Sequence, residues 1–485
     1  MTRSLVTAAS SISTLALCMV AQAAQAHNAP AGESDRARIE RLEATVAELT
    51  RRLNEQSQKT EAAAQTAAQA SAQAQQVQQA QQAAPIPAAA AKPRRQSDNN
   101  LEVYGFAQVD AIQDFKRVNP NWDATLRPSR IPTTEGQYGS NGQTVFSVRQ
   151  SRLGVKASGT VADRPYEAKF EFDIYGVGVD EGQTTMRVRH MYGKWGPILA
   201  GQTNTLFMDG DLFPNVIDYW GPPGMAFVRT PQIRFTFADD ETWLAAVALE
   251  HPSDDIDAGA IRLIDPGLAS NLQPNEELPD FTAQFQYRGD WGHVTLAGMA
   301  RKVGYDTAGT PGNNPTGSKF GWGLDAAAVV KVDPATFRVG VVYGHGIATY
   351  MNDGGMDLAP KAKLVLATPT VPPTPNPPAN LILAAETVPL LGVTAYVDLQ
   401  WSKVLSSSIG YSFTEVDNTN FQDKAAFHKG EYASANLLWT PIDRILTGVE
   451  VLWGRRTDNG GAKGDDVRAQ FSFKVSFSSK DIWGD

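Results

Sequence analysis

The last long segment of the chain, VRAQFSFKVSF at residues 467–477, alternates strictly between apolar and polar side chains. One face carries Phe471, Phe473, Val475 and Phe477, and the other carries polar and basic residues. A period of two is typical of a β-strand whose faces meet different environments. In a soluble sandwich the apolar face would cover a core. In an outer-membrane barrel it would face lipid, and the polar face would line a wet interior.

The same alternation recurs from residue 101 onward, and we count about 16 candidate strands. Connections at 288–292 and 439–444 are short, whereas those at 251–279, 303–319, 351–388 and 456–466 are long. Short turns at one end and long loops at the other are typical of outer-membrane barrels. The sequence therefore predicts an all-β fold, a transmembrane antiparallel β-barrel of about 16 strands over residues 101–485. The pattern assigns no role to the residues after Phe477.

The chain before residue 101 divides into three segments. Residues 1–26 have the basic start, apolar run and A-x-A end of a signal peptide. Residues 27–60 predict a short α-helical coiled coil, with a single amphipathic helix as the alternative. Residues 61–100 are rich in Ala, Gln and Pro and predict a periplasmic spacer. The apolar seam of the coiled coil consists of Ile39, Leu42, Val46, Leu49 and Leu53.

These segments predict a protein of the bacterial outer membrane whose N-terminal part lies in the periplasm. The coiled coil would then join copies of this chain and contact peptidoglycan or a periplasmic protein. Cys18 is the only cysteine and lies within the signal segment, so the mature chain would form neither disulfides nor thiolate metal sites. Acylation of Cys18, as in a lipoprotein, is the alternative.

Charge and motifs argue against several classes of function. The net charge of −9 is unlike that of a general nucleic-acid binder, so no nucleic-acid partner is expected. The chain has no G-x-S-x-G, H-E-x-x-H or C-x-x-C motif, and its six His share no ligand spacing. We therefore expect a protein that is not an enzyme and has no cofactor or metal site.

Strand alternation also assigns side chains to the lumen. In TTMRVRHMYG, for example, it places Arg187 and Arg189 on the lumen face and Met186, Val188, His190 and Tyr192 on the opposite face. Basic residues outnumber acidic ones on the lumen face, and rings of one charge set ion preference in a pore. The alternative is that these residues pair with acids and only hold the shape of the wall. The predicted pore-lining residues are Arg152, Lys156, Lys169, Arg187, Arg189, Arg234, Arg288, Arg338, Arg468 and Lys474.

Residues 205–230 follow the fifth candidate strand and are too long and aromatic for a simple turn. In porins the loop at about this position folds inward and narrows the channel, and an ordinary surface loop is the alternative. The residues predicted to stand at the constriction are Asp209, Asp211, Asp218, Tyr219, Trp220 and Arg229.

Three stretches, LEVYGFAQVD, RQSRLGVK and ILAGQTNTLFMDGDLFPNVIDYWGP, resemble the DcaP-like porins, as does the order of signal peptide, coiled coil, spacer and barrel. The resemblance implies a homotrimeric outer-membrane channel for small, preferentially anionic solutes such as dicarboxylates. The chain is more distantly similar to sugar and phosphate porins with N-terminal coiled coils. A barrel-anchored adhesin or structural protein with a plugged lumen is a further alternative.

Overall fold

The computed structural model describes residues 43, 44, 47, 50, 51, 99–308, 315–366 and 379–480. The chain divides into two compact units, Met1–Arg94 and Arg95–Asp485. In the first unit the described residues are helical and exposed. The signal peptide, the coiled-coil seam and the spacer up to residue 98 lie outside the described residues, so these three assignments stay predictions.

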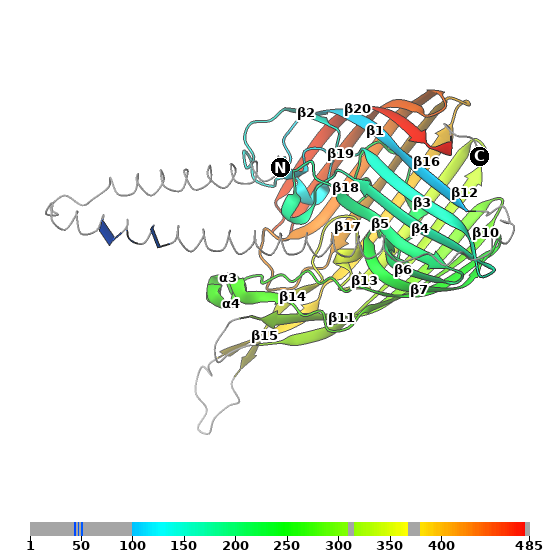
Figure 1. The fold of residues 1–485 in the computed structure, drawn as a ribbon. Coiled ribbons are helices and arrows are strands. Elements are labelled where there is room, and N and C mark those ends of the chain that lie inside the picture. Colours follow the sequence, from blue (N-terminus) through cyan, green and yellow to red (C-terminus); the bar gives the residue numbers. More distant parts are fainter. Residues whose placement is uncertain are drawn as a thin grey trace, which may run out of the picture. The chain divides into compact units, whose positions relative to one another are not determined.

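The second unit contains a closed antiparallel barrel of 16 strands, which confirms the predicted fold class (Figure 1). Two short strands, β2 (Gln143–Ser147) and β9 (Leu272–Pro274), pair with the last residues of two barrel strands, Asp110–Asp114 and Tyr305–Thr307. The barrel strands in order are β1 (Asn100–Asp114), β3 (Arg152–Val161), β4 (Arg164–Asp173), β5 (Arg187–Trp195), β6 (Ile198–Asn204), β7 (Arg229–Asp239), β8 (Trp243–Glu250), β10 (Asp280–Gly289), β11 (Gly292–Thr307), β12 (Gly317–Val332), β13 (Ala335–His345), β16 (Pro389–Gln400), β17 (Leu405–Val416), β18 (Phe427–Ile442), β19 (Ile445–Asp458) and β20 (Lys463–Ser478).

The alternating C-terminal segment closes the barrel. Strand β20 pairs with β1 from Tyr104↔Ser478 to Asp114↔Arg468, and β1 pairs with β3 on its other side. Closure gives every strand two neighbours, which a sheet in lipid requires because its backbone groups find no water there. Phe471 and Phe473 are 45% and 41% exposed, whereas Ser472 between them is fully buried. The aromatic face therefore points to the membrane and the polar face into the barrel.

Seven short turns connect the strands at one end of the barrel, the end at which β1 begins and β20 finishes. Ala162 and Asp163 form a two-residue turn with φ of 51° and 59°, the positive values that a tight hairpin turn needs. Exposed tryptophans lie at or near these turns, as in the aromatic girdles of membrane barrels. They are Trp195, Trp243, Trp291, Trp401 and Trp439.

The connections at the other end are mostly long, but two are shorter than the sequence suggested. Residues 459–462 form a tight turn, because β19 and β20 extend through most of the predicted loop 456–466. Likewise β11 and β12 take up much of 303–319. The loop after β13 contains a separate hairpin of β14 (Leu358–Leu366) and β15 (Ala379–Thr387), and the loop after β8 contains the helices α3 (Ile261–Ile264) and α4 (Pro266–Asn271). Among the described residues, no helix is long and apolar enough to cross a bilayer.

Three long connections pack against the inside of the barrel wall. They are residues 115–151, which contain η1 (Pro120–Trp122) and η2 (Pro128–Arg130), residues 205–228, which contain η4 (Gly210–Leu212), and residues 346–357, which contain η5 (Ala348–Tyr350). Glycines in the wall allow the close approach. A Cβ at Gly340 would lie 2.4 Å from Leu212, and one at Gly323 would lie 2.7 Å from the Phe207 ring. The buried core of the protein therefore lies inside the barrel.

Candidate functional site: a cavity between the inward loops and the barrel wall

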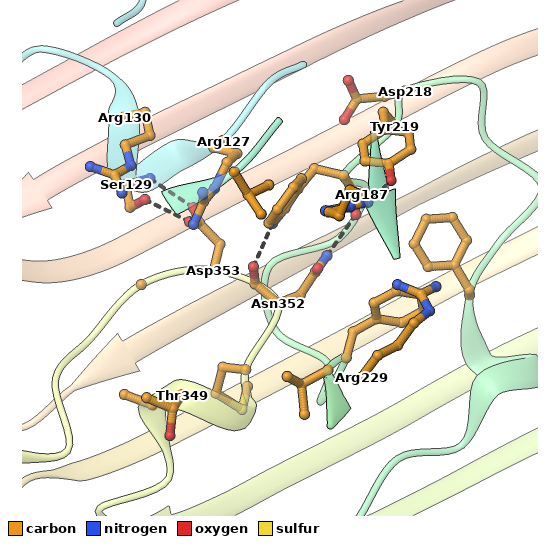
Figure 2. Close-up of a pocket in the computed structure, with 18 of the residues that line it drawn as sticks. Arg127, Ser129, Arg130, Arg187, Asp218, Tyr219, Arg229, Thr349, Asn352 and Asp353 are labelled. Carbon is orange, nitrogen blue, oxygen red and sulfur yellow. Dashed lines mark hydrogen bonds and ion pairs between the residues drawn. The ribbon is translucent and has the colours of Figure 1, made fainter. Parts of the chain in front are cut away.

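A cavity of about 1290 Å³ remains between the three inward loops and the wall (Figure 2). Basic side chains dominate its lining, with ten Arg or Lys residues against six Asp or Glu residues. The protein as a whole is acidic, so positive charge is concentrated in this cavity. The ten basic residues are Arg127, Arg130, Arg152, Lys169, Arg187, Arg189, Arg229, Arg262, Arg456 and Lys474.

Contacts between the loops hold one side of the cavity in shape. The side-chain amide of Asn352 donates to the carbonyl oxygens of Trp220 and Pro222 at 2.7 and 2.8 Å. Arg127 donates to Asp353 at 2.9 Å, and its guanidinium lies 4.1 Å from the ring centroid of Trp122 and 4.4 Å from that of Trp220. An arginine stacked on two rings and paired with a buried acid has little freedom to move. Figure 2 shows the pair of Arg127 and Asp353 at the cavity.

On the opposite side, strands β3 to β5 bring several cations around two acids. Glu171 lies 2.9 Å from Arg189, 3.4 Å from Lys169 and 3.5 Å from Arg152. Two residues along β4, on the same face, Asp173 lies 2.7 Å from Arg187 and 3.0 Å from Arg189. Two carboxylates therefore form ion pairs with four cations, and the group keeps an excess of positive charge. We call these six residues the basic wall: Arg152, Lys169, Glu171, Asp173, Arg187 and Arg189.

Tyr219 joins the loop after β6 to the basic wall. Its hydroxyl donates to Asp173 and accepts from Arg187 and Arg189. Figure 2 shows Tyr219 beside Arg187. Its ring stacks on Tyr175, with centroids 4.1 Å apart and planes at 5°. The loop is thus held against the basic wall by three of its members.

A β-bulge changes which side chains of β5 enter the lumen. The register between β4 and β5 shifts at Glu171, so Phe172 pairs with Val188 while Glu171 pairs with His190. The alternation-based assignment of His190 and Tyr192 to the face opposite Arg187 and Arg189 is therefore wrong. His190 Nδ1 lies 2.9 Å from Thr203 Oγ1, and His190 borders the cavity. One inserted residue reverses the side-chain direction beyond it.

Arg229, the first residue of β7, completes the cationic cluster without an acid of its own. It borders the same cavity as Arg152, Arg187 and Arg189, and its guanidinium lies 4.9 Å from the Phe227 ring centroid. Among the described residues it forms no ion pair, and its buried Nε has no hydrogen-bond acceptor. A guanidinium in this state presents free donors to an anion in the cavity.

The structure divides the ten predicted pore-lining residues into two groups. Arg152, Lys169, Arg187, Arg189 and Lys474 border the cavity. The other five do not border it, although four of them point inward and form contacts with the wall or the loops. Lys156 pairs with Glu167, Arg234 donates to the Asn204 carbonyl oxygen, Arg288 pairs with Asp239, and Arg338 pairs with Asp398.

Arg468 corrects the prediction in a different way. Its side chain is fully buried and makes two hydrogen bonds to Asp114, of 2.6 and 2.9 Å. A third hydrogen bond, of 2.9 Å, reaches the Asp123 carbonyl oxygen in the first inward loop. The loop covers the strand end, so this arginine anchors the loop and does not meet solvent.

The six predicted constriction residues also fall into two groups, one that borders the cavity and one that does not. Tyr219, Trp220, Asp218 and Arg229 border the cavity, whereas Asp209 and Asp211 lie at the turn η4 against β11. Asp218 accepts hydrogen bonds from Thr125 Oγ1 at 2.8 Å and from the Gly221 N–H at 3.1 Å. Burial raises the pKa of the Asp218 carboxyl above its ordinary value, although these bonds and Arg468 oppose the rise. Whether any of the sixteen predicted residues contacts a solute stays a prediction.

Strand alternation missed the loop residues of the cavity. Arg127, Arg130 and Asp353 come from two inward loops that have no periodic pattern. Their neighbours in sequence are turn formers such as Pro128 and Gly354. No feature of the sequence signals that these residues face the basic wall.

Comparison with known proteins agrees with the fold. A model of the DcaP outer membrane protein family matches residues 47–325. The structure is similar to the outer membrane channel DcaP of Acinetobacter baumannii, with a TM-score of 0.62 and 21% sequence identity, over 78% of this chain and 97% of that chain. No curated protein matches the chain in sequence.

Two further solved structures are similar at lower scores. The anion-selective porin from Comamonas acidovorans has a TM-score of 0.49 and 7% identity, over 78% of this chain and 100% of that one. Salmonella typhi OmpF has a TM-score of 0.46 and 14% identity, over 78% and 98%. Because the family model spans more than half of a chain that folds as a 16-stranded barrel, this protein belongs to the DcaP family of outer membrane proteins and is a porin-type channel.

Proposed function

We propose that the barrel conducts small solutes with a preference for anions, including dicarboxylates. The observation that carries this proposal is the cluster of five cations, Arg229 and the four in the basic wall, around only two carboxylates. The planar fork of arginine matches carboxylate oxygens in pairs, which favours a carboxylate over a halide of the same charge. The cavity also borders Asn204 and Gln202, whose amides are further hydrogen-bond donors.

Two alternatives fit the cavity less well. A sugar path needs open aromatic faces, but cations lie over several rings that line the cavity: Arg127 over Trp220, Arg152 and Lys474 over Phe106, and Arg229 over Phe227. A plugged anchor needs a filled lumen, yet a cavity of about 1290 Å³ remains. Arginine recognises phosphate through the same paired oxygens as carboxylate. The cavity geometry therefore does not distinguish a phosphate channel from a dicarboxylate channel, and a measurement must do so.

Reversal potentials in planar bilayers test the anion preference. Under a salt gradient, the reversal potential of the open channel should have the sign expected when anions permeate more readily than cations. The preference should weaken as salt rises, because charges in a wet lumen are screened within roughly 8 Å at physiological ionic strength. Succinate and inorganic phosphate, each added to chloride, separate the two solute classes by their block of chloride current. A cation preference, or a channel that passes no current, contradicts the proposal.

We further infer that three copies assemble and that the N-terminal segment lies in the periplasm. Strand β1 begins at the end of the barrel with the short turns, and short turns are periplasmic in outer-membrane barrels. A short coiled coil is marginal alone, so it depends on contacts made by the barrels themselves. Its partner in the periplasm would be peptidoglycan or a protein.

Deletion of residues 35–57 should weaken the trimer but leave conducting pores. Unheated gel electrophoresis of the intact chain should show a trimer, and the deleted chain should dissociate at a lower temperature because it lacks the coiled-coil contribution. Planar-bilayer recordings of the deleted chain should still show channels. Complete loss of folded, conducting protein would mean that the barrel contacts do not hold the assembly.

A further inference from the structure

Three buried carboxylates surround one arginine where two connections meet the barrel wall. Arg301 of β11 lies 2.6 Å from Asp254, 3.2 Å from Asp280 and 3.4 Å from Asp357, and all four side chains are fully buried. Asp280 is the first residue of β10, Asp254 belongs to the connection after β8, and Asp357 belongs to the connection after β13. We call these four residues the Arg301 cluster. It joins both connections to the wall around a single positive charge.

Hydrogen bonds do not satisfy all three acids of the cluster. Asp254 and Asp357 each accept a backbone N–H on their second oxygen, at 2.8 and 2.9 Å. Asp280 Oδ2 accepts from the Tyr350 hydroxyl at 2.9 Å, but Asp280 Oδ1 has no hydrogen-bond partner among the described residues. Burial of a charged carboxylate is costly, and an unpartnered oxygen adds to that cost. A proton on one of the three carboxyl groups relieves it.

Further acids border the cluster. Glu250 of β8 is directly opposite Asp280 in the strand register, and its Oε2 is another buried oxygen without a hydrogen-bond partner. Glu276 accepts from the Asp254 N–H at 3.3 Å, and Asp255 is the next residue along the same connection. These three acids add negative charge to a cluster that already has more carboxylates than cations.

The cations of the neighbouring elements are engaged elsewhere. Arg130 of η2 pairs with Glu181 at 3.5 Å, and Lys302 pairs with Glu277. Arg234 of β7 donates to the Asn204 carbonyl oxygen at 2.6 Å. Among the described residues, no ion pair joins any of these three cations to the Arg301 cluster. The excess of acid over base in the cluster therefore remains.

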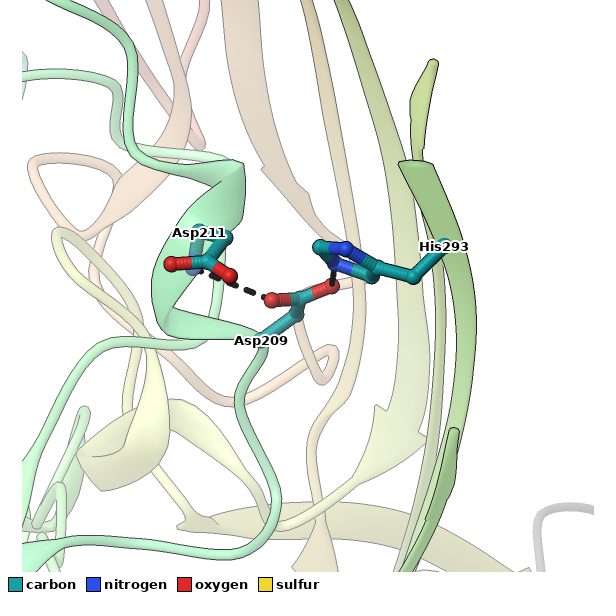
Figure 3. Close-up of side chains that lie close together, drawn as sticks. All are labelled: Asp209, Asp211 and His293. Atoms are coloured by element: carbon teal, nitrogen blue, oxygen red, sulfur yellow. Dashed lines mark hydrogen bonds and ion pairs between the residues drawn. The ribbon is translucent and has the colours of Figure 1, made fainter. Parts of the chain in front are cut away.

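A buried acid in the turn η4 shows the contrasting, fully partnered arrangement (Figure 3). Asp209 Oδ2 lies 2.8 Å from His293 Nε2 and accepts from Thr295 Oγ1 at 2.8 Å. Asp209 Oδ1 accepts from the Asp211 N–H at 3.0 Å. Both oxygens of Asp209 have partners, so it is stable as a carboxylate without a proton of its own. Asp280 lacks this second partner.

We propose that the Arg301 cluster binds a proton, and that the connections after β8 and β13 dock on the wall more firmly with this proton than without it. Without the proton, three carboxylates crowd around one guanidinium and repel one another. Both connections line the cavity, through residues such as Asp255 and Thr349, so their docking sets its width. The consequence for current rests on the conduction proposed above, and we expect a wider path at alkaline pH than at acid pH.

The direction and size of the effect follow from Asp254, which lies in a connection. Burial raises the pKa of the Asp254 carboxyl to about 6, although the Gly304 N–H and Arg301 oppose the rise. In an undocked connection the same group would have the ordinary pKa of about 3.9. A raised pKa favours docking below the ordinary value, and this contribution is lost as pH rises through the raised one. The docking constant should therefore fall about tenfold between pH 5 and pH 8.

Labelling of a cysteine at a buried position of the connection after β13 measures docking directly. Ala348 of η5 is 7% exposed, whereas Met356 of the same connection is 38% exposed. The rate at which a maleimide labels Ala348→Cys, divided by the rate for Met356→Cys, should rise about tenfold from pH 5 to pH 8. The division removes the pH dependence of the thiol, and the chain without either substitution gives the background.

Asp280→Asn should reduce this rise to about twofold or less, because the amide keeps an acceptor for Tyr350 and has no charge to lose. Asp254→Asn should do the same and serves as the second variant if the first does not fold. Asp465→Asn is the control, since Asp465 pairs with Lys116 at 2.9 Å outside the cluster, and the rise should be unchanged. The heat-dependent gel shift of folded barrels checks the fold of each variant.

A labelling ratio that is equal at pH 5 and pH 8 would overturn the proposal. So would an undiminished rise in both Asp280→Asn and Asp254→Asn. Single-channel conductance should increase over the same pH range. If labelling depends on pH as expected but no current passes at any pH, proton-dependent docking stands and the proposed conduction fails.

Discussion

Arg229→Gln should lower the affinity of the channel for a small dianion by about tenfold at low salt. A unit charge at about 4 Å contributes between about 1 kcal/mol in bulk water and about 4 kcal/mol near a protein surface, and about 1.4 kcal/mol corresponds to tenfold. Arg229 has no acid partner among the described residues, so its removal leaves no carboxylate unpaired. Block of chloride current by succinate measures the affinity, and the reversal potential should shift toward cations.

Arg234→Gln is the matched control, because it makes the same change on the same strand. Arg234 donates to Gln232 and to the Asn204 carbonyl oxygen and does not border the cavity. We expect its effect on succinate block to be several times smaller. Equal effects of the two variants would show that the charge of the whole lumen matters and that the cluster at Arg229 has no special role. If Arg229→Gln leaves succinate block and the reversal potential unchanged, the assignment of Arg229 to the anion site is wrong.

Arg301→Met should destabilise the docking of the loops that follow β8 and β13 by about 3–5 kcal/mol, the usual cost of removing one partner from a buried ion pair. Arg301 on β11 is fully buried and lies 2.6 Å from Asp254 and 3.4 Å from Asp357. It also donates to the carbonyl oxygens of Ser253 at 2.7 Å and Gly346 at 3.1 Å. Without it, the three buried carboxylates of Asp254, Asp280 and Asp357 must take up protons or meet water.

The expected result is a lower melting temperature and a larger, noisier single-channel conductance, because residues 251–257 and 346–357 are no longer held to the wall. Asp254 is already poised for protonation, since burial raises its pKa to about 6. Lys302→Gln is the control on the same strand. Lys302 pairs with the exposed Glu277, and such surface pairs contribute about 0–1 kcal/mol. Normal conductance and stability in Arg301→Met would show that other contacts hold the loops.

The barrel itself could be predicted from the sequence because its signal is local. Successive side chains of a strand point to opposite faces. A strand with lipid on one face and water on the other therefore alternates apolar and polar residues with a period of two. Phe471 and Phe473 could be assigned to the membrane from that period alone. The same rule placed Arg152, Lys169, Arg187 and Arg189 in the lumen, as the structure has them.

The face assignment from strand alternation was wrong where β5 has one extra residue relative to β4. The bulge at Glu171 brings both Arg189 and His190 into the lumen, and the sequence RVRHMYG contains no residue that marks it. The bulge follows from pairing with β4, a contact between two strands, so neither strand shows it by itself.

The hydrogen-bond and ion-pair partners of the lumen residues are determined by the tertiary structure and not by the sequence pattern. Arg468 has the same alternation as Lys474, yet the first inward loop buries Arg468 against Asp114 and leaves Lys474 at the cavity. Asp209 and His293 are 84 positions apart and meet because the loop after β6 turns inward over β11. Strand periodicity reports which face a side chain takes, since that is a property of the local backbone. Which loop covers that face depends on long-range packing inside the barrel, and only the tertiary structure determines it.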